Sequence, residues 1–335
     1  MIKSIKWLLI AMIMAFLLFI ARNFLHKDSS LPKQHIPIIG VIQAIDHCAL
    51  DQTRQGILDE LKDNGFEPST TMQWVYESAQ GNPVLVTQII QKFISQKVDL
   101  ILTIGTTPSQ AAVQLTQSDP SIPIIFSSVT DPISAKLLTN PQSPEANITG
   151  VSNFIEVEKQ LDVFKKILIP LKKLGLIYNP GEANSVTLIK KTQEAAQELG
   201  IQLILTTANK TSEVLPAVQS LIGKVDAIFI NNDNTALAAF EAIGTISQEH
   251  NLPVFVSDID FIKKGALAAL GPDQRLLGRQ TGKMVLKILK EKKSIGEIPV
   301  EGPERPTLKI DFEKAKQFNI HFGHHSFLTE FDVTQ

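Results

Sequence analysis

The chain has 335 residues, of which 44% are hydrophobic and 20% charged; this suits a globular protein with room for two domains and argues against long disordered segments. Its net charge is −2 and no basic run is longer than a pair, so the positive surface that nucleic-acid binding requires is missing. The single cysteine, Cys48, excludes an intrachain disulfide and a cysteine-based zinc cluster.

The N-terminal residues have the pattern of an export signal. Two lysines precede an apolar run, Trp7–Ala21, and Arg22 follows it. The end of this run lacks a clear cleavage site, so we predict an uncleaved signal or membrane anchor helix over residues 1–25. A cleaved signal and a cytoplasmic helix are the alternatives. The positive flank predicts a body in the periplasm or on the outer face of the cytoplasmic membrane. The polar residues 26–35 indicate a linker.

From Ile36 onward, short apolar runs alternate with helical patterns. The predicted strands of the first half are Ile36–Gln43, Thr70–Tyr76, Leu100–Ile104 and Ile124–Phe126, and its predicted helices are Ala49–Asn64, Val84–Ser95 and Ser109–Gln117. The segment Asn140–Asn147 contains two prolines and breaks this rhythm. We therefore expect it to approach a crossover between the two halves.

The alternation restarts at Lys172. The predicted strands of the second half are Leu174–Tyr178, Ile201–Thr206, Ala227–Ile230 and Val254–Ser257, and its predicted helices are Asn184–Leu199, Glu213–Ile222 and Leu237–His250. Because strands and helices alternate throughout, we predict an α/β fold with two parallel sheets and helices on both faces of each.

The two halves also repeat each other. The stretches Lys97–Ala112 and Lys224–Ala239 both open with Lys-Val-Asp, continue as an apolar strand, reach a polar tip and resume with Ala-Ala. Three further landmarks keep the same order, pairing Gly40 with Gly175, Gly65 with Gly200, and Ile122–Ser128 with Leu252–Asp258. Four landmarks in register predict an internal duplication.

Polar residues follow the predicted strands in both halves. In parallel α/β sheets, ligands bind outside the carboxyl ends of the strands. The candidate ligand-binding residues are His47, Thr106, Thr107, Thr130, Asp131, Asn184, Ser185, Asp233, Asn234 and Asp258. For Thr107, Asn184 and Asn234, the alternative interpretation is that they only cap helices.

The charges near these strand ends indicate the class of ligand. Several aspartates lie there, whereas no lysine or arginine does. Carboxylates favour a ligand with an ammonium group, and free N–H groups at helix starts favour a carboxylate. An amino acid carries both groups. We expect the carboxylate at Thr106, Thr107, Asn184 and Ser185, the amine at Asp233 with Asp131 or Asp258, support from Asn234, and a side-chain pocket at His47.

Enzyme signatures are missing from the sequence. We find neither the glycine-rich phosphate-binding motifs nor Gly-x-Ser-x-Gly, and no His-x-x-x-His pair on a predicted helix. We therefore predict no catalytic activity, cofactor or metal. For the C-terminal cluster of His321, His324 and His325, a polar tail is the prediction and metal binding the alternative.

Six stretches carry a resemblance to a known family. They are Gly40–Asp51, Phe126–Pro132, Asn147–Ser152, Tyr178–Ser185, Asp233–Thr235 and Leu277–Met284. These stretches resemble the ABC transporter substrate-binding proteins assigned to tryptophan and tyrosine, and the resemblance covers about Ile36 to Ala315. It implies a type I periplasmic-binding-protein fold, in which two Rossmann-like lobes joined by a hinge with three crossovers clamp a ligand.

The resemblance also implies lobe boundaries and partners. We expect residues 36–150 plus about 266–292 in the N-terminal lobe, and residues 151–265 plus about 293–335 in the C-terminal lobe. The implied partners are an ABC permease and its ATPase, the N-terminal helix would contact the membrane, and we expect a monomer. The predicted function is extracytoplasmic amino-acid capture for an importer, with aromatic amino acids among the candidates. A membrane-anchored sensor of the same fold is the alternative.

Overall fold

The computed structural model describes residues 7, 12–18, 20, 35–145, 147–320 and 332–334. The chain divides into two units, Met1–Ile36 and Pro37–Gln335, and the second contains both β-sheets. Residues 12–18 are helical, but most of the predicted anchor and linker lies outside the described residues, as do His321, His324 and His325. In the described part of the chain, no helix is long and apolar enough to cross a membrane. The N-terminal anchor therefore stays a prediction.

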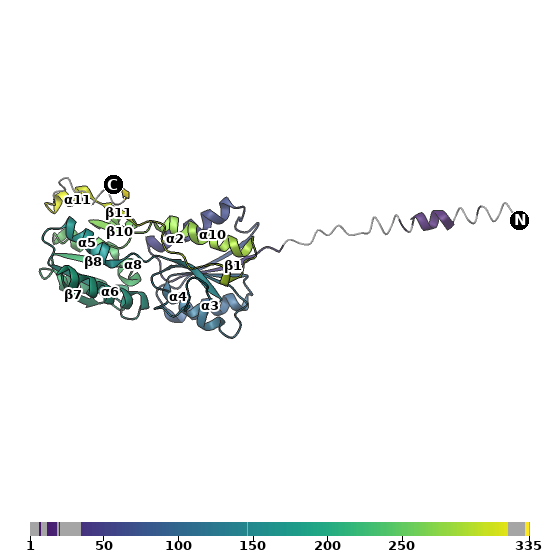
Figure 1. Cartoon of the computed structure of the whole chain (residues 1–335), viewed down its shortest axis with the longest axis horizontal. Helices are drawn as coiled ribbons and strands as arrows, with labels where there is room; N and C mark the ends of the chain where they lie inside the picture. The colour runs from purple at the N-terminus through teal and green to yellow at the C-terminus, as the bar shows by residue number, and fades with distance from the viewer. Residues whose placement is uncertain are drawn as a thin grey trace. The chain divides into compact units, whose positions relative to one another are not determined.

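The first sheet is entirely parallel and has the strand order β2-β1-β3-β4-β5. Its strands are β1 (Ile38–Gln43), β2 (Gln73–Ser78), β3 (Leu100–Ile104), β4 (Ile124–Val129) and β5 (Ile148–Ser152). The helices around it are α2 (Cys48–Asp63), α3 (Pro83–Ser95), α4 (Thr106–Thr116) and α10 (Gln274–Leu289). Helices α3 and α4 cover one face of the sheet, and α2 and α10 cover the other (Figure 1). Their apolar side chains form the core on each face.

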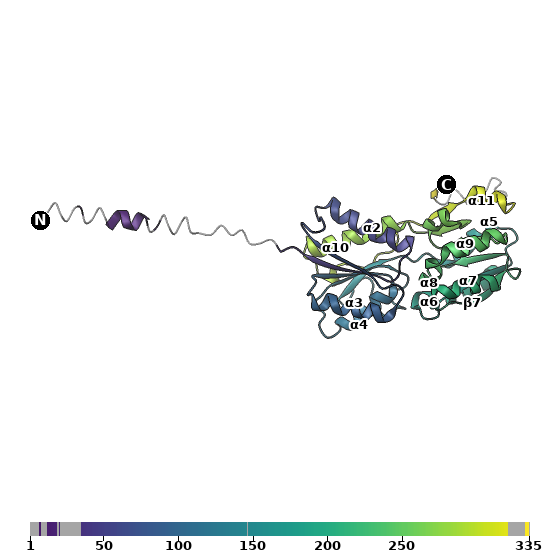
Figure 2. The ribbon, with the colours of Figure 1, turned by 180° about the vertical axis from the view of Figure 1, so that it is seen from behind.

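The second sheet has the order β12-β11-β10-β9-β8-β6-β7, and only the β10–β11 pair is antiparallel. Its strands are β6 (Lys173–Tyr178), β7 (Gln202–Thr207), β8 (Ala227–Ile230), β9 (Val254–Val256), β10 (Ala268–Gly271), β11 (Thr307–Ile310) and β12 (Asp332–Thr334). Its α-helices are α5 (Val157–Ile167), α6 (Ala183–Leu199), α7 (Thr211–Leu221), α8 (Asn234–Ala238), α9 (Phe240–Glu249) and α11 (Phe312–Gln317). Two 3₁₀ helices follow β9 and α10, at η1 (Ile259–Lys264) and η2 (Ile295–Glu297). Helices α5 and α6 pack on one face, and α7, α8 and α9 on the other (Figure 2).

The predicted duplication is visible in the topology. The orders β2-β1-β3-β4 and β7-β6-β8-β9 place equivalent strands at equivalent positions. A Cβ at Gly40 in β1 would lie 2.7 Å from the ring of Phe93, and one at Gly175 in β6 would lie 2.9 Å from Leu221. Each glycine thus makes room for a large side chain of the helix that covers it. The α/β fold with two largely parallel sheets, predicted from the sequence, is confirmed.

The chain passes between the two sheets three times. It leaves the first sheet after β5, returns after β10 so that α10 packs against α2, and leaves again before β11. We call the first sheet with α2, α3, α4 and α10 the first lobe, and the remainder from α5 to β12, with α10 excluded, the second lobe. Within residues 266–292, which were expected in the first lobe, strand β10 needs correction, because it pairs with β9 and β11 and so lies in the second sheet, whereas α10 packs against α2 of the first lobe. The other boundaries stay predictions.

Several elements differ from their predicted extents. Strand β2 begins at Gln73 instead of Thr70, because residues 67–72 form a hydrogen-bonded turn in which the Glu67 carbonyl accepts from the N–H groups of Thr71 and Met72. The predicted helix Leu237–His250 is two helices, α8 and α9, that meet at Ala239. Strand β5, which the sequence pattern did not show, closes the edge of the first sheet against β4.

Helices α2 and α10 pack closely because glycines face the partner backbone. A Cβ at Gly278 would lie 2.1 Å from the carbonyl oxygen of Thr53, and one at Gly56 would lie 2.0 Å from that of Arg275. Any larger side chain would push the helices apart. This close packing places Gln274, the first residue of α10, beside Thr53 on α2.

Candidate functional site

A cavity lies between the lobes at the carboxyl ends of the strands. The lining residues are His47, Ala49, Leu50, Thr106, Ser128, Thr130, Asn153 and Gln274 from the first lobe and the segment that leaves it, and Asn184, Asn232, Asn234, Leu237 and Asp258 from the second. The lining thus includes the predicted residues His47, Thr106, Thr130, Asn184, Asn234 and Asp258.

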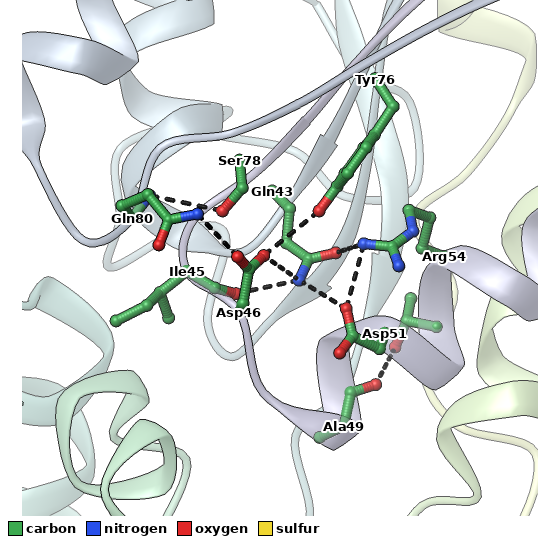
Figure 3. Close-up of polar contacts among 10 residues, drawn as sticks. Gln43, Ile45, Asp46, Ala49, Asp51, Arg54, Tyr76, Ser78 and Gln80 are labelled. Atoms are coloured by element: carbon green, nitrogen blue, oxygen red, sulfur yellow. Dashed lines mark hydrogen bonds and ion pairs between the residues drawn. The ribbon is translucent and has the colours of Figure 1, made fainter.

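The loop between β1 and α2, which carries His47, is held by a polar network (Figure 3). Gln43 at the end of β1 is fully buried, and its Nε2 donates to the carbonyl of Ile45 at 2.9 Å and to Asp51 Oδ1 at 3.0 Å. Its Oε1 accepts from the Arg54 guanidinium at 2.7 Å, and that guanidinium lies 4.2 Å from the ring centroid of Tyr76. The network therefore ties the loop to α2 and β2.

His47 reaches from this loop to the second lobe. Its Nε2 lies 3.2 Å from Asn234 Oδ1, while its buried Nδ1 has no hydrogen-bond partner. The side chain is 8% exposed, and its ring centroid lies 6.1 Å from that of Phe261. Burial lowers the pKa of His47, because desolvation disfavours the charged imidazolium. A neutral imidazole with one unpaired ring nitrogen therefore lines the cavity.

Glu182 supports the same corner from the second lobe. Its Oε2 accepts from Nδ2 of Asn234 at 2.7 Å and from Nδ2 of Asn184 at 3.1 Å, and its Oε1 accepts from Thr235 Oγ1 at 2.7 Å. The carboxyl group is turned away from its own helix, α6, where Glu182 is the N-cap residue without a side-chain cap bond. This contact holds two of the cavity-lining asparagines, Asn184 and Asn234.

Asp233 is not part of the cavity lining. It is the N-cap residue of α8, where its carboxyl accepts from the N–H of Ala236 at 2.7 Å. It also accepts from the N–H of Asn179 and from Ser185 Oγ, both at 2.6 Å. Burial and the nearby Glu182 carboxylate raise the pKa of Asp233. The carboxyl of Asp233 and the hydroxyl of Ser185 therefore form these hydrogen bonds within the second lobe.

The predicted residues Thr107 and Asp131 also lie outside the lining. Asp131 accepts from the N–H groups of Ile133 and Ser134, at 3.1 and 2.9 Å, and so closes the turn that follows β4. Thr107 is half-buried in the first turn of α4, next to the lining residue Thr106. The carboxyl of Asp131 thus accepts hydrogen bonds from the backbone of its own turn, which is the usual role of an aspartate in a loop.

Asp258 and Gln274 meet across the cavity. The carboxyl of Asp258 is 1% exposed and accepts from Gln274 Nε2 at 2.7 Å and from the N–H of Asp260 at 3.0 Å. Burial, and then the neighbouring Asp260, raise the pKa of Asp258 to about 8. Since Gln274 lies on α10 and Asp258 follows β9, this contact joins the two lobes.

Two helices of the first lobe begin at the cavity without a side-chain cap. The N-cap residues are His47 for α2 and Gly105 for α4, and neither makes a side-chain cap bond. Ala49, Leu50 and Thr106 in the first turns of these helices line the cavity. The backbone N–H groups of such turns and the helix dipoles favour an anionic group. No lysine or arginine is among the lining residues that the structure describes.

Comparison with known proteins decides the family. The sequence matches the family described as ABC transporter substrate binding protein over residues 38–329. The chain belongs to this family. Its members bind solutes and are not enzymes, and the resemblance noted in the sequence is thereby confirmed.

This substrate-binding protein has relatives with named ligands. It is 30% identical over 282 residues to a protein named Tyrosine-binding protein from Clostridioides difficile (strain R20291), which covers 84% of this chain and 81% of the relative. Its structure is similar to that of an ABC domain from Streptococcus pneumonia in complex with L-Trp, with a TM-score of 0.83, 26% identity, and coverage of 89% of this chain and 99% of that one.

Two further solved structures are similar to this chain. A conserved domain protein from Vibrio cholerae has a TM-score of 0.84 and 36% identity, and covers 90% of this chain and 100% of its own. The ligand-free, open structure of a substrate-binding protein with adhesive properties from Clostridium difficile has a TM-score of 0.65 and 29% identity, with coverage of 90% and 99%. More distant solute-binding proteins, 14–16% identical, share the fold alone, which is that of type I periplasmic binding proteins.

Some cavity residues of this substrate-binding protein were not among the predicted site residues. Ser128 and Asn232 belong to polar strand ends that the sequence pattern shows. Asn153 and Gln274 follow β5 and β10, two strands that were not predicted. The expectation that ligands bind at strand ends could therefore not point to these two residues. Ser128 reaches the lining through a break in the strand register at a positive φ of 55°, a local feature that the sequence pattern did not indicate.

Proposed function

We propose that this chain is the extracytoplasmic binding component of an ABC importer and that it captures an amino acid in zwitterionic form. The observation that carries the proposal is the composition of the cavity wall. Uncapped starts of α2 and α4 favour a carboxylate, while Asp258 and the unpaired acceptors His47 Nδ1 and Asn184 Oδ1 favour an ammonium group.

Six of the ligand-binding residues expected from the sequence remain in the proposed site, and some of them receive a different role. Thr106 and the first turn of α2 would receive the carboxylate, and Asp258 with His47 and Asn184 would receive the ammonium group. Thr130 and Asn234 complete the polar wall, whereas Leu50 and Leu237 offer apolar surface for the ligand side chain. We further propose that Asp233 and Ser185 support this wall from behind, since they bond to each other.

An aromatic amino acid is the preferred ligand class. Two relatives support it: one is named Tyrosine-binding protein, and one solved structure holds L-Trp. The conformation supports capture by hinge closure, because this structure is more similar to the L-Trp complex, at a TM-score of 0.83, than to the ligand-free open structure, at 0.65. The sequence identities, 26% and 29%, run in the opposite direction, so sequence divergence does not explain the gap, and we propose a difference in lobe arrangement as its cause.

The partners and location follow from the importer role. A permease and its ATPase would receive the ligand, and we propose that the apolar N-terminal run directs the chain to the outer face of the cytoplasmic membrane. Whether that run stays attached is measured by mass spectrometry of the membrane-bound and released chain.

A thermal-shift screen of the full chain against amino acids, nucleobases and sugars tests the ligand class. Stabilisation by L-tyrosine or L-tryptophan, which raises the midpoint in proportion to the logarithm of ligand concentration, is the expected result. Stabilisation only by sugars or nucleobases would overturn the proposal. Uptake of the labelled amino acid by cells with and without the chain then tests transport, and uptake that is the same in both would argue for a sensor.

A further inference from the structure

A single buried carboxylate orients several polar groups of the cavity wall. Glu182 is 8% exposed, and the groups that bond to its carboxyl in the described part of the chain are donors: the N–H and Nδ2 of Asn234, the N–H and Oγ1 of Thr235, and Nδ2 of Asn184. An ionised carboxyl is an acceptor only. Each amide side chain in contact with it must therefore turn its NH₂ group toward Glu182.

This requirement settles the orientation of both asparagines. An amide that presents its NH₂ to Glu182 presents its oxygen to the other side. For Asn184, Nδ2 also donates to the carbonyl of Asn232 at 2.8 Å, and Oδ1 is left buried at the cavity without a partner. For Asn234, Oδ1 points across to His47 at 3.2 Å.

The orientation of Asn234 in turn determines the tautomer of His47. Asn234 Oδ1 is an acceptor, so His47 Nε2 must carry the proton in the bond between them. His47 Nδ1 is then an unprotonated acceptor, and it is buried without a partner. Glu182, which only accepts hydrogen bonds, thus fixes the amide orientation of Asn184 directly. Through Asn234 it also fixes the tautomer of His47 in the opposite lobe.

We propose that Glu182 is the positioning residue that sets the hydrogen-bond polarity of the ligand cavity. Through the two asparagines it makes His47 Nδ1 and Asn184 Oδ1 acceptors, so the cavity selects a ligand that brings hydrogen-bond donors, as an ammonium group does. Glu182 itself touches no ligand in this scheme. The ligand class rests on the proposed function, whereas the tautomer of His47 follows from this structure alone.

The tautomer is measured by long-range ¹H–¹⁵N correlation spectra of the imidazole rings in the ligand-free chain, with His47→Gln identifying the His47 signals. The wild type should show an Nε2–H tautomer. Glu182→Gln adds a donor where only acceptors stood, so Asn234 is released to flip and the Nδ1–H form should appear. Glu198→Gln, on the exposed side of the same helix, is the matched control and should leave the spectrum unchanged. A wild-type Nδ1–H form, or an unchanged tautomer in Glu182→Gln, would overturn the proposal.

A binding ratio provides the second readout. L-tryptophan and indole-3-propionate share the ring and the carboxylate but differ in the ammonium group. We expect Glu182→Gln to lower the preference for L-tryptophan at least tenfold, and Glu198→Gln to leave it unchanged. An equal loss for both ligands would show a merely structural role and reject the assignment.

The role of Glu182 can also be tested if the variant does not fold or if the wild type does not bind an aromatic amino acid. If Glu182→Gln does not fold, Asn234→Ala removes the acceptor of His47 Nε2 while Thr235 still contacts Glu182, and the same appearance of the Nδ1–H form is expected. If the wild type binds neither aromatic amino acid, the proposed function fails, but the spectra of the ligand-free chain still test the role of Glu182.

Discussion

Gln274 connects the two lobes through both ends of its amide. Its Nε2 donates to Asp258 Oδ2 at 2.7 Å, and its Oε1 accepts from Thr53 Oγ1 at 2.9 Å and from Ser128 Oγ at 3.2 Å. All four side chains belong to buried residues. A hydrogen-bonded contact between buried side chains therefore joins the two lobes.

Replacing this amide should weaken the contact between the two lobes. Gln274→Ala leaves the buried Oδ2 of Asp258 without its partner and removes one of the partners of Thr53 Oγ1, which costs about 1–3 kcal/mol. We expect a lower free energy of unfolding in urea and a larger radius of gyration in small-angle scattering. Gln91→Ala, at an exposed glutamine on α3, is the control. An unchanged radius and an unchanged urea midpoint in Gln274→Ala would contradict the role of this contact.

Asp258 should make stability depend on pH. Its pKa is raised to about 8 in the folded chain, from an ordinary value of 3.8. Between these values the folded chain holds a proton that the unfolded chain has lost, so the contribution to stability is full below about pH 4 and is lost as the pH rises toward 8. The slope is at most about 1.4 kcal/mol per pH unit. Urea unfolding at several pH values measures it.

Asp258→Asn removes the titrating group. The unfolding free energy of the wild type minus that of the variant should therefore decrease as the pH rises. Asp162→Asn, at a partly exposed aspartate of α5, provides the comparison. A difference between wild type and Asp258→Asn that stays constant from pH 5 to 8 would mean that the pKa of Asp258 is not raised.

The sequence pattern predicted the repeated βαβ framework because that framework is encoded locally. The apolar run Leu100–Ile104 and its echo Ala227–Ile230 are strands with the bounds expected from hydrophobicity alone. Strand β10 and its antiparallel partner β11 were not predicted, since Ala268–Gly271 is short and contains two alanines and a glycine. Their pairing depends on residues about 40 positions apart, which no local pattern reports.

The direction of side chains at the site was harder to predict than their position. Asp233 and Asn234 are neighbours at the same strand end, yet Asn234 lines the cavity while Asp233 is turned inward by Asn179 and Ser185. These partners are 54 and 48 residues away. The rule that ligands bind at strand ends finds such residues, but tertiary hydrogen bonds decide which of them face the ligand.

Ligand binding should release a proton. If the ligand ammonium group lies at Asp258, its charge favours the ionised carboxyl and lowers the raised pKa. Calorimetric titration with L-tryptophan at pH 7, in buffers of different ionisation enthalpy, measures the number of protons released. We expect a release approaching one proton for the wild type and close to zero for Asp258→Asn. Equal release from both would place the ammonium group elsewhere.

Arg54→Lys should weaken the support of the His47 loop. The Arg54 guanidinium bonds Gln43 and Asp51 together and lies over Tyr76, and a lysine ammonium cannot reproduce this planar contact. We expect a loss of about 1 kcal/mol in unfolding free energy and a several-fold weaker ligand affinity by calorimetry.

The matched control for this change is Arg279→Lys. Arg279 also bridges two acidic groups, those of Glu60 and Asp63, but these residues are not part of the cavity lining. The control should lower stability slightly and leave ligand affinity unchanged. A similar loss of affinity in both variants would mean that the effect does not pass through the His47 loop.

Gly278→Ala tests whether the close contact of α2 and α10 positions Gln274. The new Cβ would lie 2.1 Å from the carbonyl oxygen of Thr53, so the helices must separate, at a cost of about 1–3 kcal/mol. Because Gln274 and Thr53 are bonded across this contact, we expect a weaker ligand affinity together with the lower urea midpoint. Gly302→Ala is the control, since a Cβ there meets no atom within 4 Å and should change neither quantity. A Gly278→Ala chain that loses stability but keeps full affinity would show that the helix contact supports the fold without placing Gln274.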